Sequence, residues 1–267
     1  QVFCYIVTWT LFPLRIVSCL FRVYCCKFVT RTWRAEDFMS IAMGLALLGC
    51  LSSFQAAFSL GCGGSEPNRC NYFDAGANLT TYLYVTAVYY SAMHFLIKVA
   101  FLTYYLRLSP NHKFRLKVGV GFGLNIGSLF INLLIDVFQC IPVPAALTLM
   151  GRLTAQCMNQ HFVLVAPAVI NVLLDIYVFT LPIPILVKLQ MPTRKKIAVI
   201  SVFAFGGASV IMGAIRFHTL LALLSYPKTS HGFGETIIVI ALELNLAAIA
   251  VNLPAVRSFW VKSNGHK

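Results

Sequence analysis

The sequence predicts an all-α polytopic membrane protein with seven transmembrane helices, its N-terminus outside and its C-terminus in the cytosol. Three observations lead to this fold class: 59% of the 267 residues are hydrophobic, only 11% are charged, and the mean hydropathy is +0.80. Soluble domains carry about 25% charged residues, so this chain has too few polar side chains to cover a water-soluble globule. Most of its surface must face lipid, which excludes disordered chains, collagens, secreted disulfide scaffolds and ordinary soluble enzymes.

Apolar segments long enough to cross a bilayer recur along the chain. A helix needs about 18 apolar residues to span a hydrocarbon core about 30 Å thick. Seven segments meet this length, at residues 2–25, 38–60, 80–106, 116–138, 162–187, 197–224 and 234–259. The connections are short and rich in Pro, Gly, Asn and charge, so residues 1–267 are predicted to form a single transmembrane domain. Because the chain begins with Gln1 rather than Met, we expect the native N-terminus to lie further upstream.

The basic residues predict the orientation of the helices. The net charge of +13 comes from 21 Lys and Arg against 8 Asp and Glu. Most of the basic residues lie at the end of, or after, the first, third or fifth predicted helix or near the C-terminus of the chain, and Arg22 is among them. The opposite loops hold only Arg69, Arg152 and Lys228. By the positive-inside rule the N-terminus lies outside, and no nucleic-acid partner is predicted. The predicted location is the plasma membrane or another membrane of the secretory pathway.

The predicted outward loops carry residues that are typical of an oxidising, glycosylating compartment. Asn78 begins an Asn-Leu-Thr sequon ahead of the third helix. Four cysteines lie in these loops or at their edges, where disulfides can form: Cys62, Cys70, Cys140 and Cys157. Four cysteines allow three pairings, and we favour the two local pairs, Cys62 with Cys70 and Cys140 with Cys157.

Ionisable side chains inside the predicted helices point to a polar centre. Each costs about 2.5–3.5 kcal/mol to insert at the middle of a helix, so each needs a partner or a function. Three basic and three acidic residues are in this position: Arg15, Lys98, Arg216, Asp136, Asp175 and Glu243. Depths counted at about 1.5 Å per residue favour a pair between Lys98 and Asp175, and another between Arg216 and either Glu243 or Asp136.

Two further polar residues extend this centre. Asn171 and Asp175 are four residues apart and share one helix face, and His94 lies at a similar depth. The ligand-binding residues we predict are His94, Lys98, Asn171, Asp175, Arg216 and Glu243. The alternative interpretation is that these groups only fix helix packing, as polar contacts in membrane bundles often do.

Small residues at a spacing of four predict close helix packing. Gly119, Gly123 and Gly127 have this spacing in the fourth segment, and Ser209 with Gly213 has it in the sixth.

Known cofactor motifs are missing from the sequence. There is no His-Glu-x-x-His pair for zinc and no paired aspartate motif for a diphosphate with magnesium. The adjacent Glu36 and Asp37 are better explained as the acidic first turn of the second helix. The last segment has no lysine for a retinal Schiff base before Lys262. We therefore predict no metal and no cofactor.

Ordered motifs along nearly the whole chain carry a family resemblance. They are Trp33-Arg34-Ala35-Glu36-Asp37, Phe138-Gln139-Cys140-Ile141-Pro142-Val143, Cys157, Asn171-x-x-x-Asp175, Leu181-Pro182-Ile183-Pro184, Leu189-Gln190-Met191-Pro192, Lys195-Lys196, Arg216, Glu243 and Leu253-Pro254. In this order they resemble the fungal rhodopsin-domain integral membrane proteins, the group that includes the Pth-type receptor-like proteins. The resemblance implies seven helices and a receptor-like role, in a family often found beside secondary-metabolite genes.

Two function hypotheses follow. The first is a fungal receptor-like protein that senses a small apolar ligand through the intramembrane polar site and signals to a cytosolic partner. The second is a cofactor-free, membrane-embedded cyclase or isomerase of a hydrophobic secondary metabolite, with Asp175 or Glu243 as acid or base. A transporter is disfavoured because no internal repeat is visible.

Overall fold

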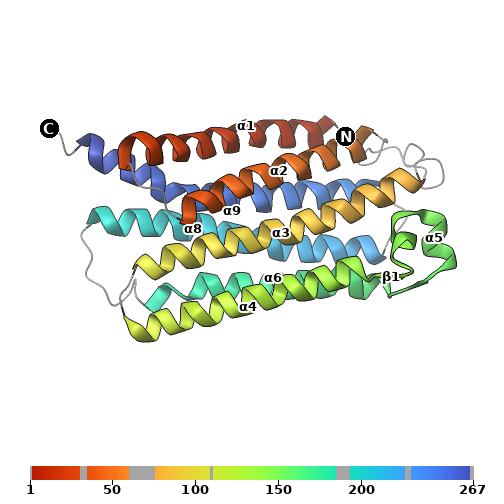
Figure 1. Ribbon diagram of the computed structural model, residues 1–267. Helices are drawn as coiled ribbons and strands as arrows, with labels where there is room; N and C mark the ends of the chain where they lie inside the picture. Colours follow the sequence, from red (N-terminus) through yellow and green to blue (C-terminus); the bar gives the residue numbers. More distant parts are fainter. Residues whose placement is uncertain are drawn as a thin grey trace.

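The protein is an elongated bundle of long helices (Figure 1). The computed structural model describes residues 2–30, 35–59, 76–108, 111–184, 193–225 and 230–264. Within these ranges the long helices are α1 (Val2–Tyr24), α2 (Ala35–Ser59), α3 (Gly76–Leu108), α4 (His112–Val137), α6 (Gln160–Thr180), α8 (Thr193–Ser225) and α9 (Ser230–Asn264). A short π-helix, η1 (Cys25–Thr30), extends α1.

Several of these helices suit a membrane environment. Four stretches in the described ranges are long and apolar enough to cross a bilayer: Tyr84–Arg107, His112–Val137, Gln160–Thr180 and Glu235–Asn252. They belong to α3, α4, α6 and α9. The predicted class, an all-α membrane protein, agrees with these helices. Seven crossings and the orientation of the termini stay predictions.

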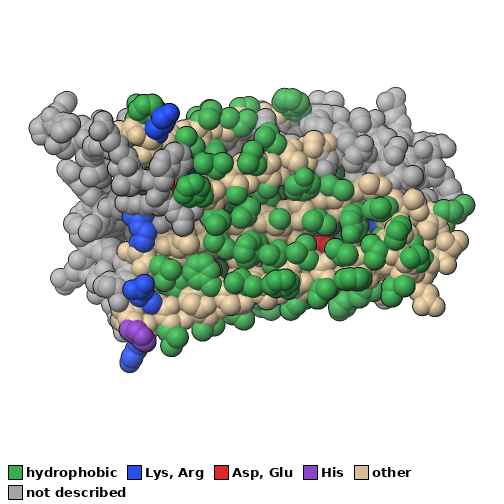
Figure 2. Space-filling view, viewed as in Figure 1, with side chains coloured by type: hydrophobic (Ala, Val, Ile, Leu, Met, Phe, Trp, Pro, Cys, Tyr) green, Lys and Arg blue, Asp and Glu red, His purple; other side chains and the backbone are tan. Residues whose placement is uncertain are grey.

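The outer surface of the bundle is apolar, as expected of a surface in contact with lipid. Leu116 and Phe130 on α4, Leu173 on α6 and Ile211 on α8 are each more than 60% exposed. Figure 2 shows such side chains spread over the middle of the bundle, with most of the visible Lys and Arg toward the end where α4 begins. In a bilayer, lipid rather than other protein side chains would keep these residues away from water.

Each predicted segment overlaps one long helix, but some ends differ for identifiable reasons. The helix predicted at 116–138 begins at His112, because the Asn111 side chain caps it by accepting a hydrogen bond from Lys113 N at 3.1 Å. The helix predicted at 162–187 ends at Thr180. Pro182 follows two residues later, and it lacks the backbone N–H that a continuing helix requires.

Helix α3 occupies the centre of the bundle. Its side chains Met93, Lys98 and Leu102 are at most 1% exposed. It packs against α2, α4, α6 and α9, and Figure 1 shows it passing through the middle of the fold. Any polar group on the inward faces of α3 therefore meets protein rather than lipid.

The predicted glycine stripe does not pack against the described part of this chain. A Cβ atom placed on Gly119, Gly123 or Gly127 would meet nothing within 4 Å. The close approach on α4 is made at Gly121 instead, where a Cβ would lie 2.9 Å from Leu102 Cδ2. The close packing predicted for Gly119, Gly123 and Gly127 is therefore not seen among the described residues, because the face that they share points away from α3.

A small disulfide-linked cap joins α4 to α6. It consists of β1 (Cys140–Ile141), the 3-10 helix η2 (Val143–Leu147), α5 (Leu149–Thr154) and β2 (Gln156–Cys157), with β1 antiparallel to β2. The predicted disulfide between Cys140 and Cys157 is confirmed.

Two other features of the predicted outward loops have different outcomes. Cys62 and Cys70 lie outside the described residues. Asn78 lies within the first turn of α3 rather than in a loop, because α3 already begins at Gly76. Its glycosylation stays a prediction.

The contrast between the two kinds of glycine on α4 can be tested by substitution. We expect Gly121→Ala to destabilise the protein by about 1–3 kcal/mol, because the added methyl group crowds Leu102 and Tyr177. The matched control, Gly123→Ala, should be neutral or stabilise by about 0.5–1 kcal/mol through helix propensity. Thermal unfolding of the detergent-purified variants measures both effects, and equal melting temperatures would contradict the packing described for Gly121.

Candidate functional site

The six predicted site residues meet inside the bundle and form what we call the polar cluster. His94 and Lys98 come from α3, Asn171 and Asp175 from α6, Arg216 from α8 and Glu243 from α9. Five of them are at most 5% exposed, and the Asp175 side chain is 14% exposed. Four helices thus contribute polar groups to one buried centre.

The first centre of the polar cluster is the Lys98 ammonium group. Its Nζ lies 3.0 Å from Asp175 Oδ1, 3.2 Å from Asn171 Oδ1 and 3.2 Å from His94 Nδ1. An ammonium group has three donors, so these three partners match its full capacity. The predicted pairing of Lys98 with Asp175 agrees with this geometry.

The second centre of the polar cluster is the Glu243 carboxylate. Arg216 Nε lies 3.3 Å from Glu243 Oε2, and His94 Nε2 lies 3.4 Å from Oε1. The Tyr90 hydroxyl donates to the same carboxylate at 3.1 and 3.3 Å. The Arg216 guanidinium also lies over the Tyr90 ring, 4.4 Å from its centroid, a distance that suits a cation–π contact. Of the two partners predicted for Arg216, the structure shows Glu243.

His94 connects the two centres, and its neighbours determine its tautomer. Lys98 Nζ can only donate a hydrogen bond, so the nearby His94 Nδ1 must accept and carry no proton. The proton of the neutral imidazole is then on Nε2, which faces Glu243. The geometry therefore assigns a neutral histidine between two ion pairs.

Two residues of this site, Tyr90 and Gly213, were not assigned to it by the sequence analysis. Tyr90 precedes His94 and Lys98 at a spacing of four on α3, which places all three on one helix face. That spacing was the available signal. Gly213 on α8 approaches the carboxylates closely, since a Cβ there would lie 3.2 Å from Glu243 Oε1 and 4.0 Å from Asp175 Oδ2. The predicted packing role of Gly213 agrees with this approach.

Asp136 lies in a different place from the polar cluster. Its Oδ2 accepts a hydrogen bond from the Ser91 hydroxyl at 2.9 Å, between α4 and α3. Three more buried polar residues, Asn125, Ser128 and Asn132, share the inward face of α4. These were also missed, because single Asn and Ser residues in an apolar segment give no signal in the composition.

Another polar network joins α1, α2 and α9. Arg22, which the sequence analysis assigned to a cytosolic loop, is only 3% exposed. Its Nε donates to Asp37 Oδ1 at 2.9 Å, and its Nη1 donates to the Val251 carbonyl. Asn252 accepts from the Ser40 hydroxyl at 2.7 Å. Asp37 is thus a partner of a buried arginine and not only an acidic residue of a helix start.

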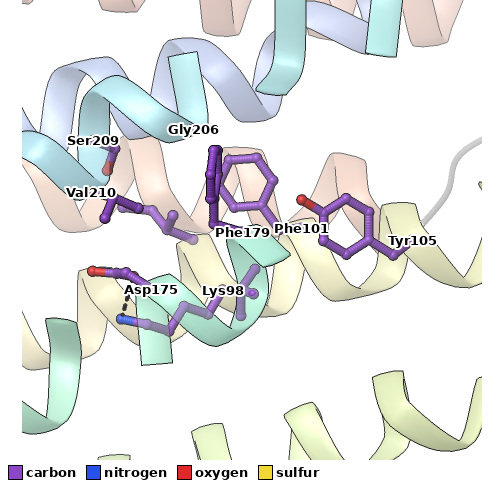
Figure 3. Close-up of a pocket in the computed structure, with 10 residues that line it drawn as sticks. Lys98, Phe101, Tyr105, Asp175, Phe179, Gly206, Ser209 and Val210 are labelled. Carbon is purple, nitrogen blue, oxygen red and sulfur yellow. Dashed lines mark ion pairs between the residues drawn. The ribbon is translucent and has the colours of Figure 1, made fainter. Parts of the chain in front are cut away.

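A small pocket adjoins the Lys98–Asp175 pair (Figure 3). It lies between α3, α6 and α8, and its walls are mainly apolar and aromatic. The lining residues are Ile97, Lys98, Phe101, Tyr105, Asp175, Val178, Phe179, Gly206, Ser209 and Val210. Apolar walls with a few polar groups are typical of small-molecule sites.

Three members of the polar cluster also have the chemistry of metal ligands. His94, Asp175 and Glu243 each offer one ligand atom, and these atoms lie within 4.8 Å of one another. Two cations of the protein already face the same groups, Lys98 at Asp175 and Arg216 at Glu243. A metal ion at these atoms would have to displace both cations.

The fold and this site define a class: a helical membrane protein whose buried polar centre is shared by four helices. The sequence model of the fungal rhodopsin domain family matches residues 21–262. The chain therefore belongs to this family. This result confirms the resemblance carried by the sequence motifs, and it supports the predicted location in a membrane.

Two curated relatives are similar to parts or most of the chain. A SAT4 family membrane protein of Emericella nidulans is 27% identical over 122 residues, which are 45% of this chain and 31% of that protein. The polyenoic acids biosynthesis gene cluster protein Ba17b of Metarhizium anisopliae is 24% identical over an alignment of 265 residues, which covers 94% of this chain and 71% of that protein. The chain thus spans less than a third of the first relative. No solved structure matches it.

The energetics of the Lys98–Asp175 pair can be tested with a double-mutant cycle. We expect Lys98→Met to destabilise the protein by about 3–5 kcal/mol, because Asp175 loses its counter-charge. The double variant Lys98→Met with Asp175→Leu should recover much of this loss, since no unpaired charge remains. Unfolding of the purified variants in detergent measures the cycle. Strictly additive losses would contradict a coupled pair.

Proposed function

We propose that this chain is a receptor-like membrane protein that senses a small apolar ligand at the polar cluster. The observation that carries the proposal is the pocket beside Lys98 and Asp175. Its aromatic wall, with Phe101, Tyr105 and Phe179, suits an apolar molecule. The charged pair at its inner side offers the polar contact that would orient such a molecule.

The ion pairs supply a mechanism for a response. Lys98 is held by partners on α3 and α6, and Arg216 on α8 faces Glu243 on α9. A ligand that competes for one of these partners changes the relative stability of two helix arrangements. The basic helix ends would then move, and a cytosolic signalling partner would recognise that movement.

The proposal includes seven crossings with the N-terminus outside, in the plasma membrane or another secretory-pathway membrane. It is supported by the distribution of Lys and Arg along the sequence. A glycan on Asn78 would place the start of α3 on the outer side.

The orientation can be tested at Asn78. We expect the wild-type chain, expressed in a fungal host, to lose mass on treatment with an endoglycosidase, and Asn78→Gln to be insensitive. Electrophoretic mobility provides the measurement. A glycan that persists in Asn78→Gln, or a wild type without a glycan, would contradict the assignment of Asn78 to the outside.

The ligand site can be tested at Asp175. A library of small apolar compounds is screened for a rise in the melting temperature of the purified protein. We expect compounds that stabilise the wild type to lose most of this effect in Asp175→Asn, because the amide cannot neutralise Lys98. Asp136→Asn is the matched control, since its buried carboxylate pairs with Ser91 outside the polar cluster. Equal stabilisation of Asp175→Asn and wild type would refute the site.

A second candidate function is a cofactor-free cyclase or isomerase. The relative from Metarhizium anisopliae, whose name refers to polyenoic acid biosynthesis, favours a biosynthetic role. Asp175 or Glu243 would act as acid or base, and Glu243 has Tyr90 and His94 beside it to exchange protons. Chromatographic separation of an isomerised product from its substrate, after a candidate hydrophobic metabolite is incubated with the purified protein, would support this candidate over the receptor.

A further inference from the structure

Two buried NH2 groups of the polar cluster have no hydrogen-bond partner among the residues that the structure describes. Among the described residues, the buried side-chain atoms without a partner are His94 Nε2, Asn132 Oδ1, Asn171 Nδ2, Arg216 Nε and Arg216 Nη2. His94 Nε2 and Arg216 Nε still face Glu243, at 3.4 and 3.3 Å. Asn132 belongs to α4 and lies outside the polar cluster. The groups that remain are Asn171 Nδ2 and Arg216 Nη2, and both are donors.

Their chemistry is fixed by their surroundings. The Asn171 oxygen faces Lys98 Nζ at 3.2 Å. Because an ammonium group cannot accept a hydrogen bond, the amide cannot be rotated to exchange its oxygen and nitrogen. A guanidinium group has five donors and no acceptor. At these two residues the polar cluster can therefore bind a further hydrogen-bond acceptor but not a further donor.

The charges of the polar cluster are already balanced. Lys98 and Arg216 are matched by Asp175 and Glu243, and His94 is neutral because its Nδ1 accepts from Lys98. A carboxylate or amine from a ligand would add an uncompensated charge to a site that is almost closed to solvent. Such a charge is far more costly there than a neutral dipole.

We infer that the polar end of the ligand is a neutral oxygen acceptor, a carbonyl group such as that of a ketone or ester, on an otherwise apolar molecule. Asn171 Nδ2 and Arg216 Nη2 are the donors available to this oxygen. This inference rests on the proposed function and specifies its ligand class. The pocket reaches the polar cluster at Asp175, and Asn171 lies one helical turn from Asp175 on α6. The aromatic wall would hold the apolar part.

A matched series of probes tests the inference. The probes are 2-tridecanone, methyl laurate, lauric acid, dodecylamine and dodecane, which share a similar chain length and differ at one end. Binding is measured as a saturable rise in melting temperature of the full chain in detergent, followed with a thiol-reactive dye. The buried Cys25 and Cys26 become reactive on unfolding. We expect the ketone and the ester to bind at least about tenfold more tightly than the acid, the amine and the alkane.

Variants place the binding at the two donors. Arg216→Lys keeps the charge opposite Glu243 but removes the second guanidinium nitrogen, and Asn171→Leu removes the amide. Each variant should bind the ketone about tenfold more weakly than the wild type does. Asn132→Leu is the matched control, because it removes a buried amide outside the polar cluster and should leave the affinity unchanged. A melting curve without probe shows which variants fold. If Asn171→Leu does not fold, Arg216→Lys alone tests the role of the donors.

The outcomes separate this inference from the proposed function. Tighter binding of lauric acid or dodecylamine that is lost in Asp175→Asn overturns the neutral head group but leaves the ligand site standing. If ketone affinity is unchanged in both donor variants but is lost in Asp175→Asn, the role of the two donors is overturned. A wild type that does not bind the ketone overturns the ligand class. Probe binding that is unaffected by every variant of the polar cluster overturns the site itself.

Discussion

The buried ammonium group of Lys98 is the constraint on which the interior of this protein depends. A charge on the central helix cannot be left without partners away from water, so the helices around α3 must bring acceptors to it. Asp175 and Asn171 on α6 do so directly. His94 links this group to a second ion pair, because its Nε2 faces Glu243, and Glu243 in turn faces Arg216. The positions of α6, α8 and α9 are therefore coupled through one chain of contacts.

The same coupling explains why small residues appear where they do. Gly213 lets α8 come close to two carboxylates, and a larger side chain would displace the groups that neutralise Lys98 and Arg216. Gly121 allows α4 to lie against Leu102 of α3. The polar cluster is thus surrounded by close helix contacts, and its electrostatics and its packing cannot be changed independently.

Much of the fold and part of the site could be predicted from sequence, because membrane insertion imposes simple rules. Segment length and hydropathy located the long helices, and charge balance at estimated depths paired Lys98 with Asp175. Other features depend on direction around a helix, which spacing alone does not give. Gly119, Gly123 and Gly127 face outward, and Arg22 turns inward to Asp37. Tyr90 was missed because aromatic residues are common in apolar helices. Its spacing of four from His94 places it on the polar face, and its contact with Glu243 shows its polar role.

The distribution of the polar cluster over four helices has a consequence for biosynthesis. Lys98 and Asn171 are 73 residues apart, and Tyr90 and Glu243 are 153 residues apart. A ribosome adds about 5–20 residues per second, so α3 would be inserted seconds before any distant partner has been made. During that interval its ammonium group needs a polar environment or another partner, within the translocon or beside an assembly chaperone. Chains shortened before α6 would carry an orphaned charge, which is the kind of feature that membrane quality control recognises.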